Sequence, residues 1–299
     1  MKPAPFSYYR ARSVPETVAR LAELGDGAKI LAGGQSLVPM MNFRLARPDA
    51  LVDVTRIPGL DYLRASAGGL RIGALTRHRT VELCRDPAVL DGFGVLPRSA
   101  RWIGHYPIRA RGTFGGSIAH ADPAAEWCLL AVLLDANVVL AGPSGTRAVP
   151  AVEFFEGFYT TTAEPAEMIT ELHFPRPARR AALAEFSPRQ GDFAVVAAAV
   201  SVDLVDPGES APACRFVRVV LGGVGPLPFV VDTAGLAGQP ATAGTWRAAG
   251  ELAAAQIDPP ADGHGGAAYR KKLAATMVQR ALTEATGTEA TGTERAGPP

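Results

Sequence analysis

The sequence predicts an α+β protein with about two domains. Its 299 residues, 47% hydrophobic and 20% charged, can bury a core of ordinary size and suffice for about two domains. In the first half, short apolar runs alternate with helical periodicity and glycine turns. After a proline- and arginine-rich stretch at residues 175–180, two long apolar runs precede two helical segments, which indicates a sheet followed by helices.

The elements of the first half are predicted in order from spacing and turn residues. Apolar residues recur at helical spacing from Val14 to Leu24, and Gly25 closes that helix. The other elements are predicted from apolar runs, from the alternation of apolar and polar residues, and from turn residues. They are strands over 29–32 and 50–54, hairpins over 61–74 and 137–152, and helices over 80–84 and 124–134.

The second half begins at a boundary placed at residue 176. Strands are predicted over 193–204 and 216–222, and helices over 245–256 and 267–282. From Thr283 the chain repeats Thr-Glu-Ala-Thr-Gly without an apolar residue larger than alanine, which predicts disorder. We therefore expect domains over 1–176, in two parts of about 1–56 and 57–176, and over 177–283, followed by a disordered tail over 284–299.

Charge and cysteine content exclude several function classes. With 30 Lys and Arg against 29 Asp and Glu, the net charge of +1 disfavours nucleic acid as a partner. No apolar run approaches the about 18 residues of a membrane span, and the N-terminus lacks a signal-peptide core, so a cytoplasmic protein is expected. The cysteines at 84, 128 and 214 are too dispersed for a disulfide framework or a metal site. Redox chemistry would therefore need a bound cofactor.

Two glycine-containing segments could bind phosphate. The first, residues 32–37 (Ala32, Gly33, Gly34, Gln35, Ser36, Leu37), follows a predicted strand, where two glycines can turn backbone N–H groups toward an anion. A plain turn is the commoner use of a glycine pair. Neither the Gly-x-Gly-x-x-Gly fingerprint nor a Walker loop is present, which disfavours a Rossmann-type site.

The second segment repeats the hydroxyl and glycine pattern in residues 113–117 (Thr113, Phe114, Gly115, Gly116, Ser117). Two such loops could hold the two phosphates of one diphosphate with neutral donors. Asp122 and Glu126 lie four residues apart at a predicted helix start. Either could cap that helix or accept hydrogen bonds from a sugar; capping is favoured for Asp122 and the two roles are even for Glu126. His105 and His120 lack partners at zinc-ligand spacing.

Together these segments resemble the FAD-binding medium subunit of the molybdenum hydroxylases, a family that includes carbon monoxide dehydrogenase and xanthine dehydrogenase. The resemblance covers about residues 3–283 and extends to residues 154–159, 192–194, 221–224 and 269–273. It implies a two-part PCMH-type FAD-binding domain, then a smaller α+β domain with an antiparallel sheet and a helical bundle, and not a Rossmann fold.

The resemblance also implies roles for individual residues. Residues 32–36 and 113–116 would hold the FAD diphosphate, Glu126 would contact the nucleotide part, Ile103 would lie near the flavin ring, and Asp122 would shape the same loop. Residue 35 is Gln where many relatives carry His, and residue 195 is Val where xanthine-oxidising relatives carry Lys. The expected cofactor set is completed by Leu37, Phe114 and Ser117, with no catalytic or metal-binding residue in this chain.

The function implied is that of an oxidoreductase subunit. Electrons would arrive from [2Fe–2S] clusters on a small iron–sulfur partner, pass through FAD and leave to a soluble acceptor. A large partner would carry molybdopterin, in a dimer of heterotrimers. The alternatives are a self-contained FAD oxidoreductase and a nucleotide-diphosphate binding module without redox turnover.

Overall fold

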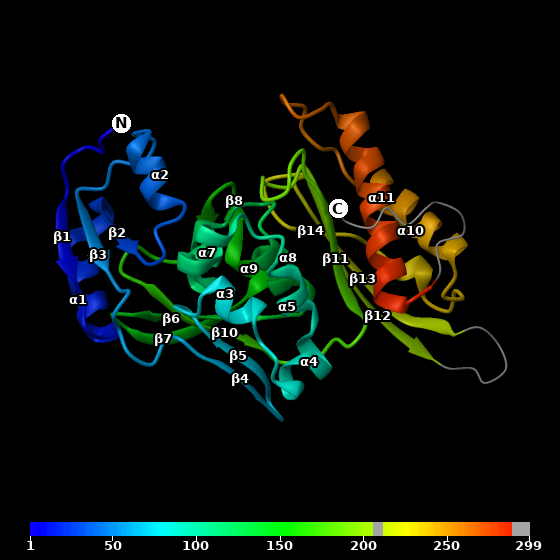
Figure 1. The fold of residues 1–299 in the computed structure, drawn as a ribbon, viewed down its shortest axis with the longest axis horizontal. Helices are drawn as coiled ribbons and strands as arrows, with labels where there is room; N and C mark the ends of the chain where they lie inside the picture. The colour runs from blue at the N-terminus through cyan, green and yellow to red at the C-terminus, as the bar shows by residue number, and fades with distance from the viewer. Residues whose placement is uncertain (206–211, 289–299) are drawn as a thin grey trace.

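Among the described residues, the three sheets of three or more strands follow one another along the long axis of the molecule (Figure 1). The computed structural model describes residues 1–205 and 212–288. The sheets are open, and they are mixed with helices throughout, which confirms the predicted α+β, non-Rossmann class. Within the described residues, no helix combines the length and apolar character needed to cross a membrane.

The N-terminal sheet is parallel, with strand order β1-β3-β2. Its helix α1 is capped by the Ser13 hydroxyl, which accepts from the Glu16 N–H, and it buries Val18 and Leu21 against the sheet. Strand β1 was not predicted, because its four residues are mostly exposed and show no apolar alternation. The elements are β1 (Ser7–Arg10), α1 (Val14–Leu24), a 3₁₀ turn (Gly25–Gly27), β2 (Ala28–Leu31), α2 (Leu37–Asn42) and β3 (Ala50–Asp53).

The central sheet is antiparallel, and its middle strand joins the two predicted hairpins in the order β4-β5-β10-β6-β7. The strands are β4 (Leu63–Ser66), β5 (Gly69–Gly73), β6 (Asn137–Gly142), β7 (Gly145–Pro150) and β10 (Met168–Phe174). A separate pair consists of β8 (Phe155–Gly157) and β9 (Thr160–Thr161). Strand β10 was missed, although Leu172 and Phe174 are fully buried.

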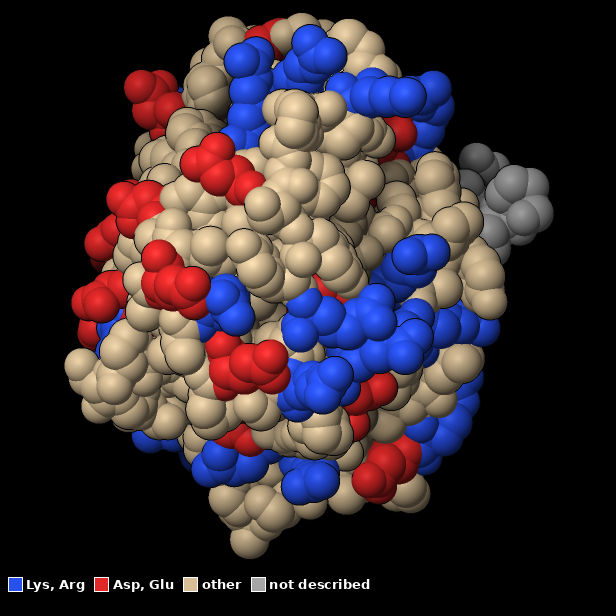
Figure 2. Space-filling model, turned by 90° about the vertical axis from the view of Figure 1, so that its left-hand side faces the viewer, with Lys and Arg blue, Asp and Glu red and all other residues tan. Residues whose placement is uncertain are grey.

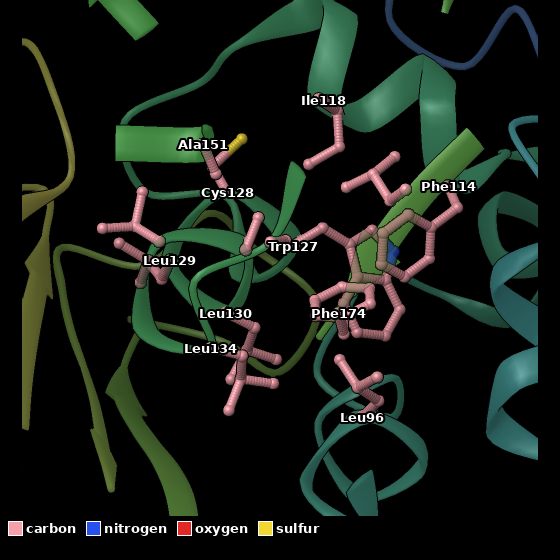
Figure 3. Packing of buried hydrophobic residues seen from close by; sticks show 14 of the residues in the cluster. Leu96, Phe114, Ile118, Trp127, Cys128, Leu129, Leu130, Leu134, Ala151 and Phe174 are labelled. Atoms are coloured by element: carbon pink, nitrogen blue, oxygen red, sulfur yellow. The ribbon is translucent and has the colours of Figure 1, made fainter. Parts of the chain in front are cut away.

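Short helices cover one face of this sheet (Figure 1). They are α3 (His78–Glu82), α4 (Pro87–Phe93), α5 (Val95–Ser99), α6 (Tyr106–Arg111), α7 (Phe114–His120), α8 (Glu126–Leu133) and α9 (Ala151–Phe154). Helix α8 is buried from Trp127 to Leu133 because α7, α9 and the strands β12 (Val196–Val205) and β13 (Ala213–Gly222) pack against it. The Phe114 ring stacks on the Trp127 indole at 4.5 Å, and Phe174 meets Phe114 edge-on in this core (Figure 3).

The C-terminal sheet is antiparallel in the order β11-β12-β13-β14, and two helices pack on one face through Trp246, Met277 and Val278. The elements are β11 (Ala181–Phe186), β12 (Val196–Val205), β13 (Ala213–Gly222), β14 (Phe229–Val230), a 3₁₀ turn (Ala234–Leu236), α10 (Ala243–Ala255) and α11 (Ala267–Thr286). Helix α11 continues through three residues assigned to the predicted tail. The rest of that tail prediction, at 289–299, lies outside the described residues.

Candidate cofactor site

The fold brings the first glycine-containing segment against Arg111 and Gly112, the two residues directly before the second segment, although about 80 residues separate them in the chain. A Cβ atom on Gly33 would stand 2.4 Å from the Arg111 carbonyl oxygen and 2.7 Å from the Gly112 Cα, so the two backbones touch where only hydrogen atoms fit between them. The His78 ring lies behind Gly112, and the His78 backbone N–H donates to the Gly112 carbonyl at 3.1 Å. The two segments thus form one structural unit.

The first segment is a turn from the end of β2 into α2. Gly34 has a φ of +70°, a left-handed conformation that favours glycine. The Gln35 side-chain amide donates to the Gly33 carbonyl at 2.9 Å and holds the turn closed. Ser36 stands at the N-cap of α2, but its hydroxyl makes no capping bond, and Leu37 is the first helical residue. Ser36 therefore has a hydroxyl available beside the turn.

The second segment is not the loop that the sequence predicted but the first turn of α7. Thr113 is the N-cap, and its hydroxyl accepts from the Gly116 N–H at 3.2 Å. Phe114 lies in the core. Gly115 is buried, and no larger residue fits there, because a Cβ atom would stand 2.6 Å from the Ala74 Cβ. Gly116 and Ser117 are the partly exposed members of the segment.

Asp122 does not cap helix α8, because that helix begins two residues later than predicted, at Glu126, with Ala125 as its N-cap. Instead, the Asp122 carboxylate accepts from the Ala124 N–H at 2.8 Å and holds a local turn. The Tyr159 hydroxyl lies 3.4 Å from the other Asp122 oxygen, at the limit of a weak hydrogen bond, and the Tyr159 ring lies against His120.

Glu126 faces a second carboxylate that the sequence did not point out, Glu185 on strand β11. Burial raises the pKa of Glu185 to about 9, and the charge of Glu126 adds to the shift. Burial also raises the pKa of Glu126 to about 7, with a smaller contribution from Asp122. Within the described part of the chain, one Glu185 oxygen is buried without a hydrogen-bond partner. A hydroxyl-bearing ligand would satisfy such an oxygen.

Ile103 is 9% exposed at the edge of the core, and its carbonyl and that of Gly104 accept from the Arg109 guanidinium. The connection between β11 and β12 reaches the same place, because a Cβ atom on Gly191 would stand 2.4 Å from the His105 ring. Close by in the chain, Phe193 is 71% exposed. Sequence reasoning missed this contact of His105 with Gly191, because it depends on tertiary packing alone.

These features fit FAD. Gly33, which contacts Gly112, and the left-handed Gly34 have no side chains. Their bare backbone borders a cradle that a side chain would fill. The partly exposed Ser36 and Ser117 hydroxyls can supply uncharged donors for a diphosphate, whereas the neighbouring Gly116 N–H donates to the Thr113 hydroxyl. The unpartnered Glu185 oxygen and Glu126 can accept hydrogen bonds from sugar hydroxyls.

Comparisons with known proteins agree with this arrangement. A family model described as the FAD binding domain in molybdopterin dehydrogenase matches residues 4–177. A second, described as the CO dehydrogenase flavoprotein C-terminal domain, matches residues 181–285.

Individual relatives match over nearly their whole length. The 6-hydroxypseudooxynicotine dehydrogenase complex subunit alpha of Paenarthrobacter nicotinovorans is 39% identical, over 95% of this chain and 96% of that protein. The carbon monoxide dehydrogenase medium chain of Hydrogenophaga pseudoflava is 36% identical, over 95% and 98%.

Two solved structures share the fold. Carbon monoxide dehydrogenase from Hydrogenophaga pseudoflava superposes with a TM-score of 0.89 at 36% identity, covering 96% of this chain and 99% of that one. Quinoline 2-oxidoreductase from Pseudomonas putida 86 gives 0.88 at 35% identity, with the same coverage. The chain belongs to the FAD-binding medium subunits of the molybdenum hydroxylase family, the flavoprotein components of molybdenum-containing dehydrogenases.

Proposed function

We propose that this chain transfers electrons from the [2Fe–2S] clusters of a small iron–sulfur partner, through its FAD, to a soluble acceptor. The observation that carries the proposal is the contact of Gly33 with Gly112, which unites two donor-bearing segments into one site suited to a diphosphate. When bound, FAD would supply the ability to exchange electrons one or two at a time. The residues of this chain bind and orient it.

We further propose which residues perform each part of the binding. The backbone of residues 32–36 and the start of α7, with Gly116 and Ser117, hold the diphosphate. Glu126 accepts from the nucleotide part, Asp122 holds the turn that presents it, and Ile103 lies beside the flavin ring. The separation of donors from acceptors along the site supports this assignment, because phosphates need donors and sugar hydroxyls can donate to carboxylates.

The proposed setting is a cytoplasmic complex with a small iron–sulfur subunit and a large molybdenum subunit, in a dimer of heterotrimers. The names of relatives as a complex subunit and as medium chains support a multi-subunit assembly. Residues 1–176, in parts of about 1–56 and 57–176, would form the FAD-binding domain, and residues 177–283 the second domain. The ranges of the two matching family models support this division.

The test is purification of the tagged full-length chain from its native host, with flavin, iron and molybdenum measured per chain. We expect about one FAD, which heat or acid releases because the proposed contacts are hydrogen bonds. We also expect iron and molybdenum from partner chains. A purified chain that never binds FAD would overturn the cofactor assignment. Substrate-driven flavin bleaching by the isolated chain would instead favour a self-contained flavoenzyme.

A further inference from the structure

A buried arginine, Arg270, joins the start of helix α11 to one end of the C-terminal sheet. Its side chain is 6% exposed, whereas Lys and Arg side chains gather at the surface on the face of the molecule that Figure 2 shows. Residue 270 lies in the first turn of α11, where the helix dipole disfavours a cation, and burial of the charge adds a desolvation cost. Specific partners must therefore offset this placement.

Those partners are oxygen atoms from three different segments. The Arg270 Nη1 atom donates to the Val195 carbonyl at 2.6 Å and to the Gly223 carbonyl at 2.7 Å. The Nη2 atom donates to the Asp262 carboxylate at 2.6 Å, and this hydrogen bond lowers the pKa of Asp262. The guanidinium thus joins the residue before β12, the turn after β13 and the loop before α11.

The turn after β13 lies directly against the residue before β12. Gly223 has a left-handed φ of +74°, and a Cβ atom there would stand 2.4 Å from the Val195 carbonyl oxygen. Because no side chain fits between these two backbones, both carbonyls lie within reach of one Arg270 nitrogen. Val195 is therefore held by Gly223 on one side and by Arg270 on the other.

Val195 is the last residue of the segment 187–195, which we call the β11–β12 connection. Its N–H donates to the carbonyl of Phe186, the last residue of β11, at 2.8 Å and closes the base of the connection. Farther out, Gly191 lies against the His105 ring of the first domain. A shift of Val195 would therefore move the segment that contacts this domain.

The other side of that contact is held in a similar way. The Arg109 guanidinium donates to the Ile103 carbonyl at 3.3 Å and to the Gly104 carbonyl at 2.8 Å. It also pairs with the Glu82 carboxylate at 2.9 Å. The contact between His105 and the β11–β12 connection thus has an arginine bound to a carboxylate behind each of its two sides.

We propose that Arg270 is a positioning residue of the flavin site, which holds the β11–β12 connection against His105 at the edge where the flavin ring binds. This inference rests on the proposed function, which places the flavin ring beside Ile103. Arg270 acts through the Val195 carbonyl and not by contact with the cofactor. Such an indirect effect is expected to be large, because a displacement of about 1 Å at a reacting centre can lower a rate by about 100-fold.

The experiment compares the wild-type full-length chain with Arg270→Lys. Lysine keeps the charge, but its single nitrogen cannot reproduce the fork that binds three oxygen atoms. We expect the FAD affinity in fluorescence titrations to fall by about tenfold, the equivalent of one lost hydrogen bond to a charged group. Hydrogen exchange of the FAD-free chain, followed by mass spectrometry, should become faster over residues 187–195. The visible circular dichroism of bound FAD should change, because it reports the surroundings of the flavin ring.

Two further variants separate positioning from stability. Asp262→Asn keeps an oxygen acceptor on a partly exposed side chain, so it should fold and shift the same three measurements in the same direction by a smaller amount. Val278→Ala is the matched control, because Val278 is a fully buried residue of the same helix that packs in the core of the C-terminal domain. It should lower the melting temperature. Its FAD affinity, its exchange over residues 187–195 and its flavin dichroism should equal those of the wild type.

The outcomes separate this inference from the proposed function. A wild-type chain that binds no FAD would overturn both. Wild-type FAD affinity and dichroism in Arg270→Lys would overturn the inference alone, whether or not exchange over residues 187–195 becomes faster. So would equal losses of FAD affinity in Arg270→Lys and Val278→Ala, because Arg270 would then act only through general stability. If Arg270→Lys does not fold, the same comparison between Asp262→Asn and Val278→Ala decides.

Discussion

The glycine pairs Gly33-Gly34 and Gly115-Gly116 look alike in the sequence but meet different demands in the structure. At the first pair, backbone conformation and close approach require glycine, since Gly34 is left-handed and Gly33 touches another backbone. At the second pair, space inside the core requires it, because Gly115 lies against Ala74 in an ordinary helical turn. Substitutions at the two pairs should therefore separate loss of cofactor from loss of fold.

The largest expected effect is that of Gly115→Val. Its side chain would clash with the Ala74 backbone as well as its Cβ, which costs about 3 kcal/mol by overpacking. The midpoint of thermal unfolding should fall by roughly 5–10 °C in a chain of this size. Gly244→Val is the matched control, because Gly244 occupies the same position after a threonine N-cap in α10 with its nearest neighbour at 3.7 Å. An equal loss in both variants would show that helix propensity, not packing, is responsible.

Next in size is the effect of Gly34→Val on FAD affinity. We expect at least about a tenfold loss in fluorescence titrations, because the left-handed turn that presents the backbone cannot form without strain. Gly59→Val is the control. Gly59 has a similar φ of +79° with no atom near its Cβ position, so it reports the conformational cost alone. Equal FAD affinities of the two variants would exclude the first turn from the phosphate site.

The burial of Glu185 can be tested through the pH dependence of stability. Because burial raises the pKa of Glu185 to about 9, the folded FAD-free chain holds this proton more tightly than the unfolded chain. Its stability should therefore fall as the pH rises from about 5 to 9. Glu185→Gln should flatten that dependence and raise the melting temperature at pH 8. Glu126, whose pKa burial also raises, remains in the variant, so some dependence should persist.

The smallest expected effects distinguish the two hydroxyls. Thr113→Ala removes a helix cap and should lower the free energy of unfolding by about 1 kcal/mol. Thr113→Ser keeps a hydroxyl and should keep most of that stability. Ser36→Ala removes no capping bond, so its melting temperature should equal that of the wild type while its FAD affinity falls modestly. A melting temperature lowered as much by Ser36→Ala as by Thr113→Ala would contradict this difference between the segments.

Much of the fold could be predicted from local patterns, and the rest depends on distant contacts. Val14–Leu24 was predicted at its observed bounds because helical periodicity and a glycine end coincide, and the structure adds a Ser13 cap. The helices from α4 to α6 have too few turns to show a period. Strand β12 starts at Val196 rather than at residue 193, and the connection before it lies against His105 at Gly191, a contact that no local pattern indicates.

The site divides in the same way. Both glycine-containing segments carry a local signal, and the resemblance placed them together in one cofactor site. Nothing local indicates that Thr113 caps a helix instead of facing a ligand, since the same hydroxyl and glycine pattern fits both. Glu185 lies in a strand without a motif, and only the tertiary fold brings it close enough to Glu126 for their charges to interact. Tyr159 reaches Asp122 in the same manner.

Strand β10 has a consequence for the order of events during synthesis. It lies between β5 and β6 and pairs with residues about 100 positions earlier, as at Glu171 and Gly73. Until the ribosome has synthesised Phe174, the two hairpins have no strand between them. The helices that pack on this sheet then lack its middle strand. The nascent chain must therefore expose Phe114, Trp127 and their neighbours until almost the end of the first domain's translation. A chaperone that shields apolar surface at that stage should raise the yield of this chain more than one that acts after release.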